Sequence, residues 1–396
     1  MLMAVIADDL TGAADSGVQF VRAGYGTAVI FHAEKAPDEG LDAVCLDTDS
    51  RTMPAGFAAK RVLEVARLAR DARVVYKKLD STLRGNVATE LAAASEAAGR
   101  DLTIVAPAFP AAGRTTVDGI QLVHGVPVDE TEVRDDPSAP VREAHVPTLL
   151  ADAFSSVGTL SLDDLADPER VRRVLHEGEC VVADAERDSD LEALVRAVPD
   201  PAEVLWAGSA GLTLALGSVY PGPREGEANA QRAPVRPVLV MVGSLSGVAR
   251  EQVRRLVEKF GEIDVLVDAG ARENAVTAAR EALAGQICAV VRSPEDRCGS
   301  GESILESLAE VAARLSEEGL VEGLILTGGA TAVGVARRLG AAGIMLQGEV
   351  ESGVPIGTLI GPKPLPVVTK AGGFGGPGTL VRAVEDLAQG EQENRP

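Results

Sequence analysis

Short apolar runs alternate with longer amphipathic runs along most of the chain. In the first half, apolar runs at Met3–Ala7, Val74–Lys77 and Leu102–Ala106 alternate with runs of helical period such as Phe57–Arg70 and Val87–Ala98. Apolar runs bounded by polar residues are typical of buried strands, and apolar residues every three to four positions are typical of amphipathic helices. Regular alternation of the two predicts βα units and a mostly parallel sheet. We therefore expect an α/β fold.

One segment interrupts this alternation near the middle of the chain. Residues 221–237 are rich in proline and charge and show no apolar periodicity, which is typical of a linker. The alternation restarts at Val238–Val242, and 396 residues exceed the size of one typical core. We predict an N-terminal domain over residues 1–220, a linker over 221–236 and a C-terminal domain over 237–390. Each domain is expected to be a mostly parallel sheet flanked by helices.

Composition and charge narrow the class of protein. The formal net charge is −21, which argues against nucleic acid or an anionic membrane as a partner. No apolar run is long enough to span a bilayer, and the apolar N-terminus lacks a basic segment, so we predict a cytoplasmic protein. The four cysteines form no C-x-x-C pair and the four histidines are scattered, which argues against a zinc site.

The densest group of polar residues follows the apolar run that ends near Lys77. The chain has seven lysines, and two of them, Lys77 and Lys78, stand here with Asp80, Ser81 and Arg84. Polar groups at the end of a strand lie where open α/β sheets bind ligands. In a strongly acidic protein, these clustered cations predict an anion site. The alternative is a solvated loop in which Ser81 caps the next helix, so that Asp80 and Arg84 form only a helical i,i+4 ion pair.

Two further strand ends carry polar residues. Asp8 and Asp9 end the first strand, and Thr11 follows them at the start of a helix. Adjacent residues on an extended segment point in opposite directions, so we expect at most one of these carboxylates to face a reacting group. The other is expected to cap the helix. The second strand end is Asp47–Arg51, where Asp49, Ser50 and Arg51 are candidates and the Arg51 guanidinium could bind a carboxylate or phosphate.

The N-terminal pattern is interrupted at residues 107–130. Gly113 and Arg114 follow a proline-rich turn, and apolar runs on both sides of His124 and Gly125 predict a β-hairpin. An excursion at the end of a strand commonly covers a binding site. On sequence alone, a hairpin without such a role is an equal alternative.

The second half contains three glycine-rich loops, each placed between a predicted strand and a predicted helix. The loop of Thr327–Thr331 is expected to precede a helix over Ala332–Leu339, and a G-x-G-x-x-G pattern spans Gly373–Gly378. Such loops present backbone N–H groups and a helix N-terminus to an anion, and three of them indicate a phosphate-rich ligand. No strand follows the last loop, which disfavours NAD, and no G-x-x-x-x-G-K-[ST] pattern exists. The predicted ligand contacts are Gly243, Ser244, Ser246, Gly328, Gly329, Ala330, Thr331, Lys370, Gly372, Gly373, Phe374 and Gly375.

Taken together, these segments resemble the four-carbon acid sugar kinase family over nearly the entire chain. The resemblance rests on Ala7–Asp15, Lys78–Asn86 and Ala106–Arg114 in the first half, and on Gly243–Ser246, Thr327–Thr331 and Lys370–Gly375 in the second. It implies a two-domain ATP-dependent kinase acting on threonate, erythronate or 3-oxo-tetronate. The N-terminal domain would hold the acid sugar, the C-terminal domain would hold ATP, and the active site would lie in the cleft between them.

The resemblance also suggests roles for the candidate residues. Lys78 and Arg84 suit the substrate carboxylate or the transferring phosphoryl group, and Asp80, Asp8 or Asp9 suits the group that accepts the hydroxyl proton. Mg²⁺ is expected to bridge the phosphates, with no protein ligand assigned. The expected substrate contacts are Asp9, Thr11, Asp49, Ser50, Arg51, Lys78, Asp80, Ser81, Arg84, Gly113 and Arg114.

Alternatives remain open at this stage. A kinase for another small hydroxy acid or sugar acid fits the same residues, and so does a regulator that binds a nucleotide or sugar phosphate without catalysis. An NAD-dependent oxidoreductase is a third reading. We expect transfer to the terminal 4-hydroxyl group, because it is primary and least hindered. The stereoisomer is left open, and so is the oligomeric state, with a homodimer as one option.

Overall fold

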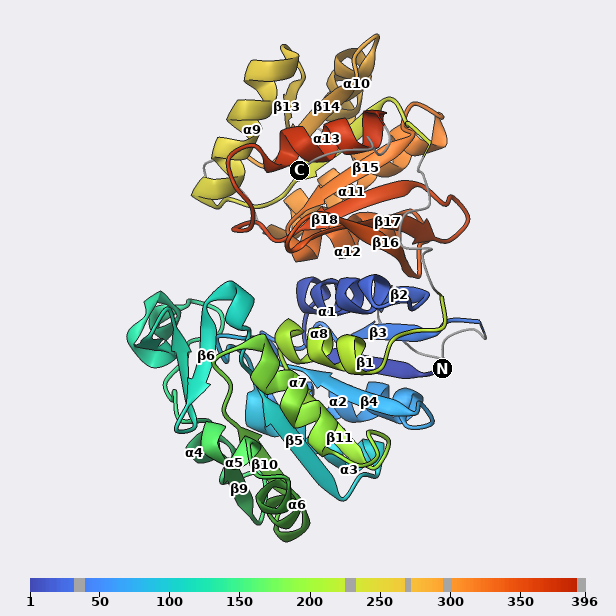
Figure 1. The fold of residues 1–396 in the computed structure, drawn as a ribbon. Helices are drawn as coiled ribbons and strands as arrows, with labels where there is room; N and C mark the ends of the chain where they lie inside the picture. Colours follow the sequence, from blue (N-terminus) through green and yellow to red (C-terminus); the bar gives the residue numbers. More distant parts are fainter. Residues whose placement is uncertain (32–39, 225–232, 268–271, 295–300, 390–396) are drawn as a thin grey trace. The chain divides into compact units, whose positions relative to one another are not determined.

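The structure is a computed structural model, and it describes residues 1–31, 40–224, 233–267, 272–294 and 301–389 (Figure 1). The chain divides into two compact units, Met1–Gly226 and Glu227–Pro396. Part of the predicted linker over residues 221–236, namely residues 225–232, lies outside the described residues.

The first unit is built on a parallel sheet. Its strand order is β2-β3-β1-β4-β11-β5-β10-β9, and every neighbouring pair is parallel. Most of these strands are buried on both faces, which is why they read as continuous apolar runs in the sequence. In sheet order the strands are β2 (Thr27–Phe31), β3 (Ala43–Asp47), β1 (Met3–Ala7), β4 (Val74–Lys78), β11 (Val204–Gly208), β5 (Leu102–Ala106), β10 (Cys180–Ala183) and β9 (Val157–Leu160).

Helices cover both faces of this sheet (Figure 1). Helix α8 packs on α1 and on α7, whereas α2 and α3 pack together with the core that contains Ile6, Leu46 and Leu91. The parallel strands need such crossover helices, so each face receives its own layer. The helices are α1 (Leu10–Arg22), α2 (Ala55–Ala69), α3 (Val87–Ala98), α4 (Val146–Leu150), α5 (Leu162–Leu165), α6 (Pro168–Glu177), α7 (Asp188–Ala197) and α8 (Ala210–Val219).

The first unit also contains a small antiparallel sheet, which follows β5 in the chain. It consists of β6 (Arg114–Val117), β7 (Ile120–Val123) and β8 (Val126–Pro127), in the order β6-β7-β8. His124 and Gly125 form the turn between β7 and β8, with φ of 49° and 82°. Positive φ at both central residues is the geometry that two-residue hairpin turns favour. The predicted hairpin is therefore present, with β6 as an additional strand.

The second unit has a mixed sheet. The strands β13-β14-β12-β15-β18 are parallel, and β17 and β16 continue the sheet in antiparallel pairs. Helices α9 and α13 pack on each other, and α11 packs on α10 and α12. The elements are β12 (Val238–Val242), α9 (Gly247–Phe260), β13 (Asp264–Leu266), α10 (Arg272–Leu283), β14 (Cys288–Arg292), α11 (Gly301–Glu317), β15 (Gly323–Thr327), α12 (Gly329–Arg338), β16 (Gly343–Glu351), β17 (Val354–Ile360), β18 (Pro366–Lys370) and α13 (Thr379–Gln389).

The mostly parallel α/β prediction is confirmed, with local corrections. Helix α12 begins at Gly329 and not at Ala332, so the glycine loop supplies the first helical turn. Ser81 does not cap a helix, because α3 begins at Val87 with Asn86 in the capping position. The antiparallel pair β16–β17 was not predicted.

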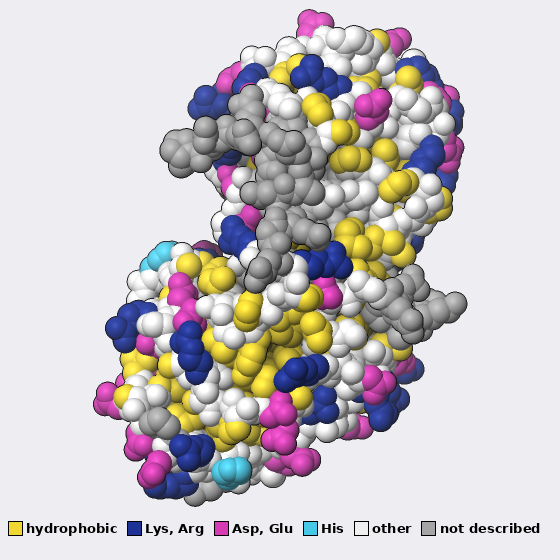
Figure 2. All heavy atoms as spheres, turned by 45° about the vertical axis from the view of Figure 1, so that its right-hand side comes forward, with side chains coloured by type: hydrophobic (Ala, Val, Ile, Leu, Met, Phe, Trp, Pro, Cys, Tyr) yellow, Lys and Arg dark blue, Asp and Glu magenta, His cyan; other side chains and the backbone are white. Residues whose placement is uncertain are grey.

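On the face drawn in Figure 2, basic side chains of the described residues lie singly or in small groups among acidic ones. Among the helices of the described part of the chain, none combines the length and apolarity needed to cross a membrane.

Candidate active site

The carboxyl ends of neighbouring strands bring the predicted residues of the first unit together. Ala7 at the end of β1 pairs with Asp47 at the end of β3, and Lys78 at the end of β4 pairs with Gly208 at the end of β11. The residues that follow these strands therefore share one edge of the sheet. This edge is where parallel α/β sheets bind ligands.

Arg51 joins the two aspartates that end β1. Its Nε and Nη2 donate to the two oxygens of Asp8, both at 2.8 Å, and its Nη1 donates to Asp9 Oδ2 at 2.6 Å. The second oxygen of Asp9 accepts from the Gly12 N–H at 2.7 Å and caps helix α1. The expectation that one of the two aspartates caps the helix is thus confirmed for Asp9. The Arg51 guanidinium nitrogens thus donate to protein carboxylates, and Arg51 stabilises the arrangement of Asp8 and Asp9 at this edge of the sheet.

The two adjacent lysines of β4 go to opposite faces of the sheet. Lys77 is fully buried and forms an ion pair with Glu90 of α3 at 2.9 Å. Lys78 points toward α1, where a Cβ on Gly12 would lie 3.3 Å from its Nζ. Among the described residues no carboxylate lies within ion-pair distance of the Lys78 ammonium, which donates to the Leu79 carbonyl at 2.8 Å. Strand alternation therefore separates a structural lysine from one that can bind an anion.

The residues from Asp80 to Arg84 form a turn and not a helix. The Leu83 N–H donates to the Asp80 carbonyl at 2.9 Å, and Leu83 has a positive φ of 59°. Asp80 accepts hydrogen bonds from the Thr82 hydroxyl at 3.1 Å and from Arg84 Nε. The helical alternative for Asp80 and Arg84 is therefore wrong, because the turn brings them together without a helix.

The small sheet lies against this turn. Gln121 of β7 is fully buried, and its Nε2 donates to the Ser81 carbonyl at 2.8 Å while its Oε1 accepts from the Thr116 hydroxyl at 2.7 Å. Asp136, which follows the small sheet in the chain, lies 3.6 Å from the Arg84 guanidinium. These contacts favour the interpretation that the hairpin covers and holds the site over the alternative of a hairpin without such a role.

The remaining predicted residues of the first unit differ in their surroundings. Ser50 is fully buried and donates to Glu90 at 2.7 Å, so its hydroxyl belongs to the network of the buried lysine. Asp49 is exposed, with a positive φ of 50°, and Thr11 is half-buried in the first turn of α1. The His124 ring packs against Gly113, where a side chain would clash with it. Arg114 Nε is buried without a hydrogen-bond partner among the described residues.

Electrostatics divides the aspartates into two groups. Burial is the largest single effect at Asp8 and Asp80 and acts to raise both pKa values. The neighbouring cations together outweigh it, Arg51 with Lys77 and Lys78 at Asp8 and Arg51 with Arg84 and Lys78 at Asp80, so both pKa values lie below the ordinary value. Burial raises the pKa of Asp9, and repulsion from Asp8 adds to it although Arg51 opposes it. Asp8 and Asp80 are therefore held in the ionised form, whereas the raised pKa of Asp9 is suitable for a proton acceptor.

Sequence reasoning missed two aspartates of this edge. Asp15 lies one turn after Thr11 on α1; burial raises its pKa, Lys78 only partly offsets this, and its carboxylate has no hydrogen bond to the described residues. Asp47 is buried at the end of β3, and burial raises its pKa to about 8 against the hydrogen bond from the Asp49 N–H. The spacing of Thr11 and Asp15, four residues apart on one helix, was the available signal for Asp15.

The three glycine loops of the second unit converge as the parallel sheet requires. Val242, Thr327 and Lys370 are aligned at the ends of β12, β15 and β18. A Cβ on Gly243 would lie 2.1 Å from Thr331 Oγ1, and a Cβ on Gly372 would lie 2.0 Å from Ser244 Oγ. Ser246 caps α9 and donates to the Gly372 carbonyl at 2.7 Å. The loops therefore form one surface of backbone and hydroxyl groups.

Two glycines of this surface face open space. A Cβ on Gly329, at the start of α12, or on Gly373 would meet no atom within 4 Å. Neither glycine has a positive φ, so neither is needed for backbone conformation. The protein alone does not require glycine at these positions, but the close approach of a phosphate would. Phe374 beside them is 46% exposed.

Lys370 is the cation of this surface. It is buried, its Nζ donates to the Ala371 carbonyl at 2.8 Å, and burial lowers the pKa of Lys370 to about 8. The nearby Glu351, which is also engaged by Arg382, acts in the opposite direction but does not offset the effect of burial on the pKa. A partly desolvated ammonium beside backbone donors is a suitable phosphate ligand. No group of three or more His, Cys, Asp or Glu side chains in the described ranges is arranged to hold a metal ion.

Two family models match the chain. A sugar-binding N-terminal domain matches residues 3–216, and a nucleotide-binding C-terminal domain matches residues 239–380. Similar curated proteins include a D-threonate kinase from Bordetella bronchiseptica, 38% identical over 97% of both chains. A D-threonate kinase from Salmonella typhimurium is 36% identical over 97% of this chain and 98% of its own, and a D-erythronate kinase from Heliobacterium modesticaldum is 30% identical over 97% and 96%.

Solved structures share the fold over the same length. A Salmonella typhimurium structure described as a putative tRNA synthase has a TM-score of 0.82 at 26% identity and covers 97% of this chain and 98% of its own. A Haemophilus influenzae structure has a TM-score of 0.78 at 23% identity, over 97% of this chain and 100% of its own. The second likeness shows the fold alone.

Proposed function

Because the chain belongs to the four-carbon acid sugar kinase family, we propose that it transfers the γ-phosphoryl group of ATP to a hydroxyl group of a four-carbon sugar acid. The observation that carries this proposal is the division of binding chemistry between the two units. The first holds Lys78 among aspartates, with no carboxylate of the described residues within ion-pair distance of its ammonium, and the second holds open glycine loops around Lys370. We assign the acid to residues 1–220 and the nucleotide to residues 237–390.

The first unit supplies groups for each part of the acid. Lys78 binds the substrate carboxylate or the transferring phosphoryl group, because the neighbouring arginines are already engaged by protein carboxylates. Arg114, the first residue of β6, is a second candidate cation for the acid, because its buried Nε has no hydrogen-bond partner among the described residues. Asp80 fixes Arg84 and the turn, and its lowered pKa makes it a poor proton acceptor.

The second unit supplies the phosphate site. Backbone N–H groups at Gly329 and Gly373 and the Lys370 ammonium neutralise the charge of the phosphates. Mg²⁺ would enter together with ATP and would supply positive charge to the phosphates; we assign it no protein ligand.

A first test of the activity is an ADP-release assay with MgATP over a panel of four-carbon aldonates and their 3-oxo forms. We expect one member, with a free terminal 4-hydroxyl, to stimulate ADP formation. If no member of the panel does so, the proposed function is wrong.

We also propose that the enzyme is cytoplasmic. That it forms a homodimer stays a prediction.

Asp15 is the best-placed proton acceptor. Its pKa is raised and its carboxylate is free of hydrogen bonds within the described residues, so Asp15→Asn is expected to lower turnover by about 10²–10⁴-fold with a small change in Tm. Asp9→Asn keeps an amide oxygen for the helix cap and is expected to cost less. Steady-state kinetics on both variants checks this. Near-normal turnover in Asp15→Asn would transfer the role to Asp9.

The depressed pKa of Lys370 predicts a pH dependence of nucleotide binding. Lys370 is charged below about pH 8 and neutral above it, and phosphate binds only the charged form. ATP affinity is therefore expected to fall as the pH rises through about 8, approaching tenfold per pH unit above it. Phosphate itself is already ionised there, since its second pKa lies near about 6. Calorimetry from pH 7 to 10 measures this. The dependence should disappear in Lys370→Met, and its persistence would exclude Lys370 as the cause.

A further inference from the structure

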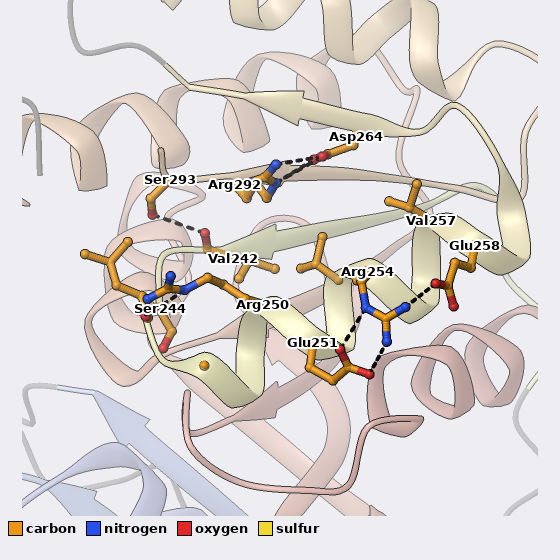
Figure 3. Close-up of a pocket in the computed structure, with 13 residues that line it drawn as sticks. Val242, Ser244, Arg250, Glu251, Arg254, Val257, Glu258, Asp264, Arg292 and Ser293 are labelled. Atoms are coloured by element: carbon orange, nitrogen blue, oxygen red, sulfur yellow. Dashed lines mark hydrogen bonds and ion pairs between the residues drawn. The ribbon is translucent and has the colours of Figure 1, made fainter. Parts of the chain in front are cut away.

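A groove in the second unit runs along helix α9, starting from the first glycine loop. It has a volume of about 710 Å³ and lies between α9 and the strands β12, β13 and β14. Figure 3 shows Val257 and Arg254 on the α9 side, with Arg292 and Asp264 on the opposite, strand side. A volume of this size is within the range of small-molecule sites.

The groove begins at the phosphate surface. Ser244 and Gly247 line one end of it, and they belong to the loop and the first turn that precede and open α9. The same Ser244 side chain lies against Gly372 of the third glycine loop, where a Cβ would come within 2.0 Å of its Oγ. A ligand whose phosphates lie on the glycine loops can therefore extend past Ser244 into the groove.

The lining of the groove suits an uncharged, flat group better than a phosphate. Apolar contacts come from Val242, Val253 and Val257, and two of the three arginines that line the groove are paired with carboxylates. The third, Arg250, donates to the Leu245 carbonyl at the end of the groove near Ser244. Arg292 pairs with Asp264 at 2.8 Å, and Arg254 pairs with Glu251 and Glu258. A phosphate would meet three carboxylates there, whereas an aromatic ring can pack on the valines and stack on a guanidinium plane.

We propose that the groove beside α9 binds the nucleoside part of ATP, so that base and phosphates occupy separate, adjoining surfaces. This inference rests on the proposed nucleotide site of the same unit. It predicts that ATP and an inorganic polyphosphate respond differently to changes in the groove, which the phosphate site alone does not predict. Groups that fill the groove should affect ATP and leave an inorganic polyphosphate unaffected.

The test compares ATP with tripolyphosphate by calorimetry on the full chain. Val257→Trp places an indole in the groove and is expected to weaken ATP binding by roughly ten- to a hundredfold, the size of a lost base-stacking contact. Tripolyphosphate affinity is expected to stay within about twofold, because that ligand does not enter the groove. Val248→Trp is the matched control, since Val248 is on the same helix, is 38% exposed and does not line the groove. It should leave both affinities unchanged.

A second measurement needs no variant. Adenosine added in excess to the wild-type protein should displace ATP and leave tripolyphosphate bound. The inference is overturned if folded Val257→Trp binds ATP normally, if it weakens both ligands equally, or if adenosine displaces tripolyphosphate. If the wild-type protein binds neither ATP nor tripolyphosphate, the nucleotide assignment itself fails together with the groove.

Discussion

Replacing Lys78 with methionine is expected to lower kcat/KM for the acid by about 10²–10³-fold, the typical effect of removing one donor that stabilises transition-state charge. No carboxylate among the described residues lies within ion-pair distance of the Lys78 ammonium, so its charge is available to the ligand. Its long stem is buried, and methionine keeps much of that packing. The melting temperature should therefore change little.

The neighbouring lysine is a matched control. Lys77→Met removes the partner of Glu90 and leaves a buried carboxylate without its counter-charge, which is expected to cost about 3–5 kcal/mol of stability. Steady-state kinetics and thermal unfolding on the two variants should therefore give opposite results: lost activity for Lys78 and lost stability for Lys77. An active Lys78→Met enzyme with normal KM and kcat would remove Lys78 from the site.

The second large effect concerns the open glycines. Gly329→Val or Gly373→Val should abolish measurable ATP binding, because a branched side chain would occupy the space that the phosphates need. The protein itself offers no clash at either position, so folding should be retained. Binding of the acid, measured separately, should be unaffected because we assign it to the other unit.

Gly56→Val is the control for these variants. Gly56 lies in the first turn of α2, and a Cβ there also meets no atom within 4 Å. The substitution is chemically the same but lies in the unit that we assign to the acid. Unchanged ATP affinity in folded Gly329→Val and Gly373→Val would show that the glycine loops do not hold the phosphates.

Local pattern was sufficient for much of the fold. Helix α3 spans Val87–Ala98 as predicted, because its apolar period is visible in the sequence. A glycine, Gly99, follows its last residue and ends the helix in the left-handed conformation. The antiparallel strand β16, Gly343–Glu351, was missed because its second half is polar and half-buried, so it lacks a continuous apolar run. Periodicity identifies strands buried on both faces more readily than strands at a partly exposed end of a sheet.

The candidate site shows the same division between local and long-range information. Strand alternation predicts that Lys77 and Lys78 face opposite ways, but only the folded chain shows that α3 supplies Glu90 to one of them. Helix α1 begins at Leu10, which places Asp15 one turn after Thr11. The bond from Gln121 to Ser81 joins residues forty positions apart, which no local pattern records.

The account is tested most directly by following the γ-phosphoryl group itself. The protein is incubated with γ-labelled MgATP and the four-carbon acid that stimulates ADP release, and the labelled products are separated. We predict that the label appears in a phosphorylated acid, in an amount equal to the ADP formed, and that Lys78→Met greatly reduces it. Label recovered only as inorganic phosphate, or retained in ATP with every acid of the panel, would contradict the central claim that this protein is a sugar-acid kinase.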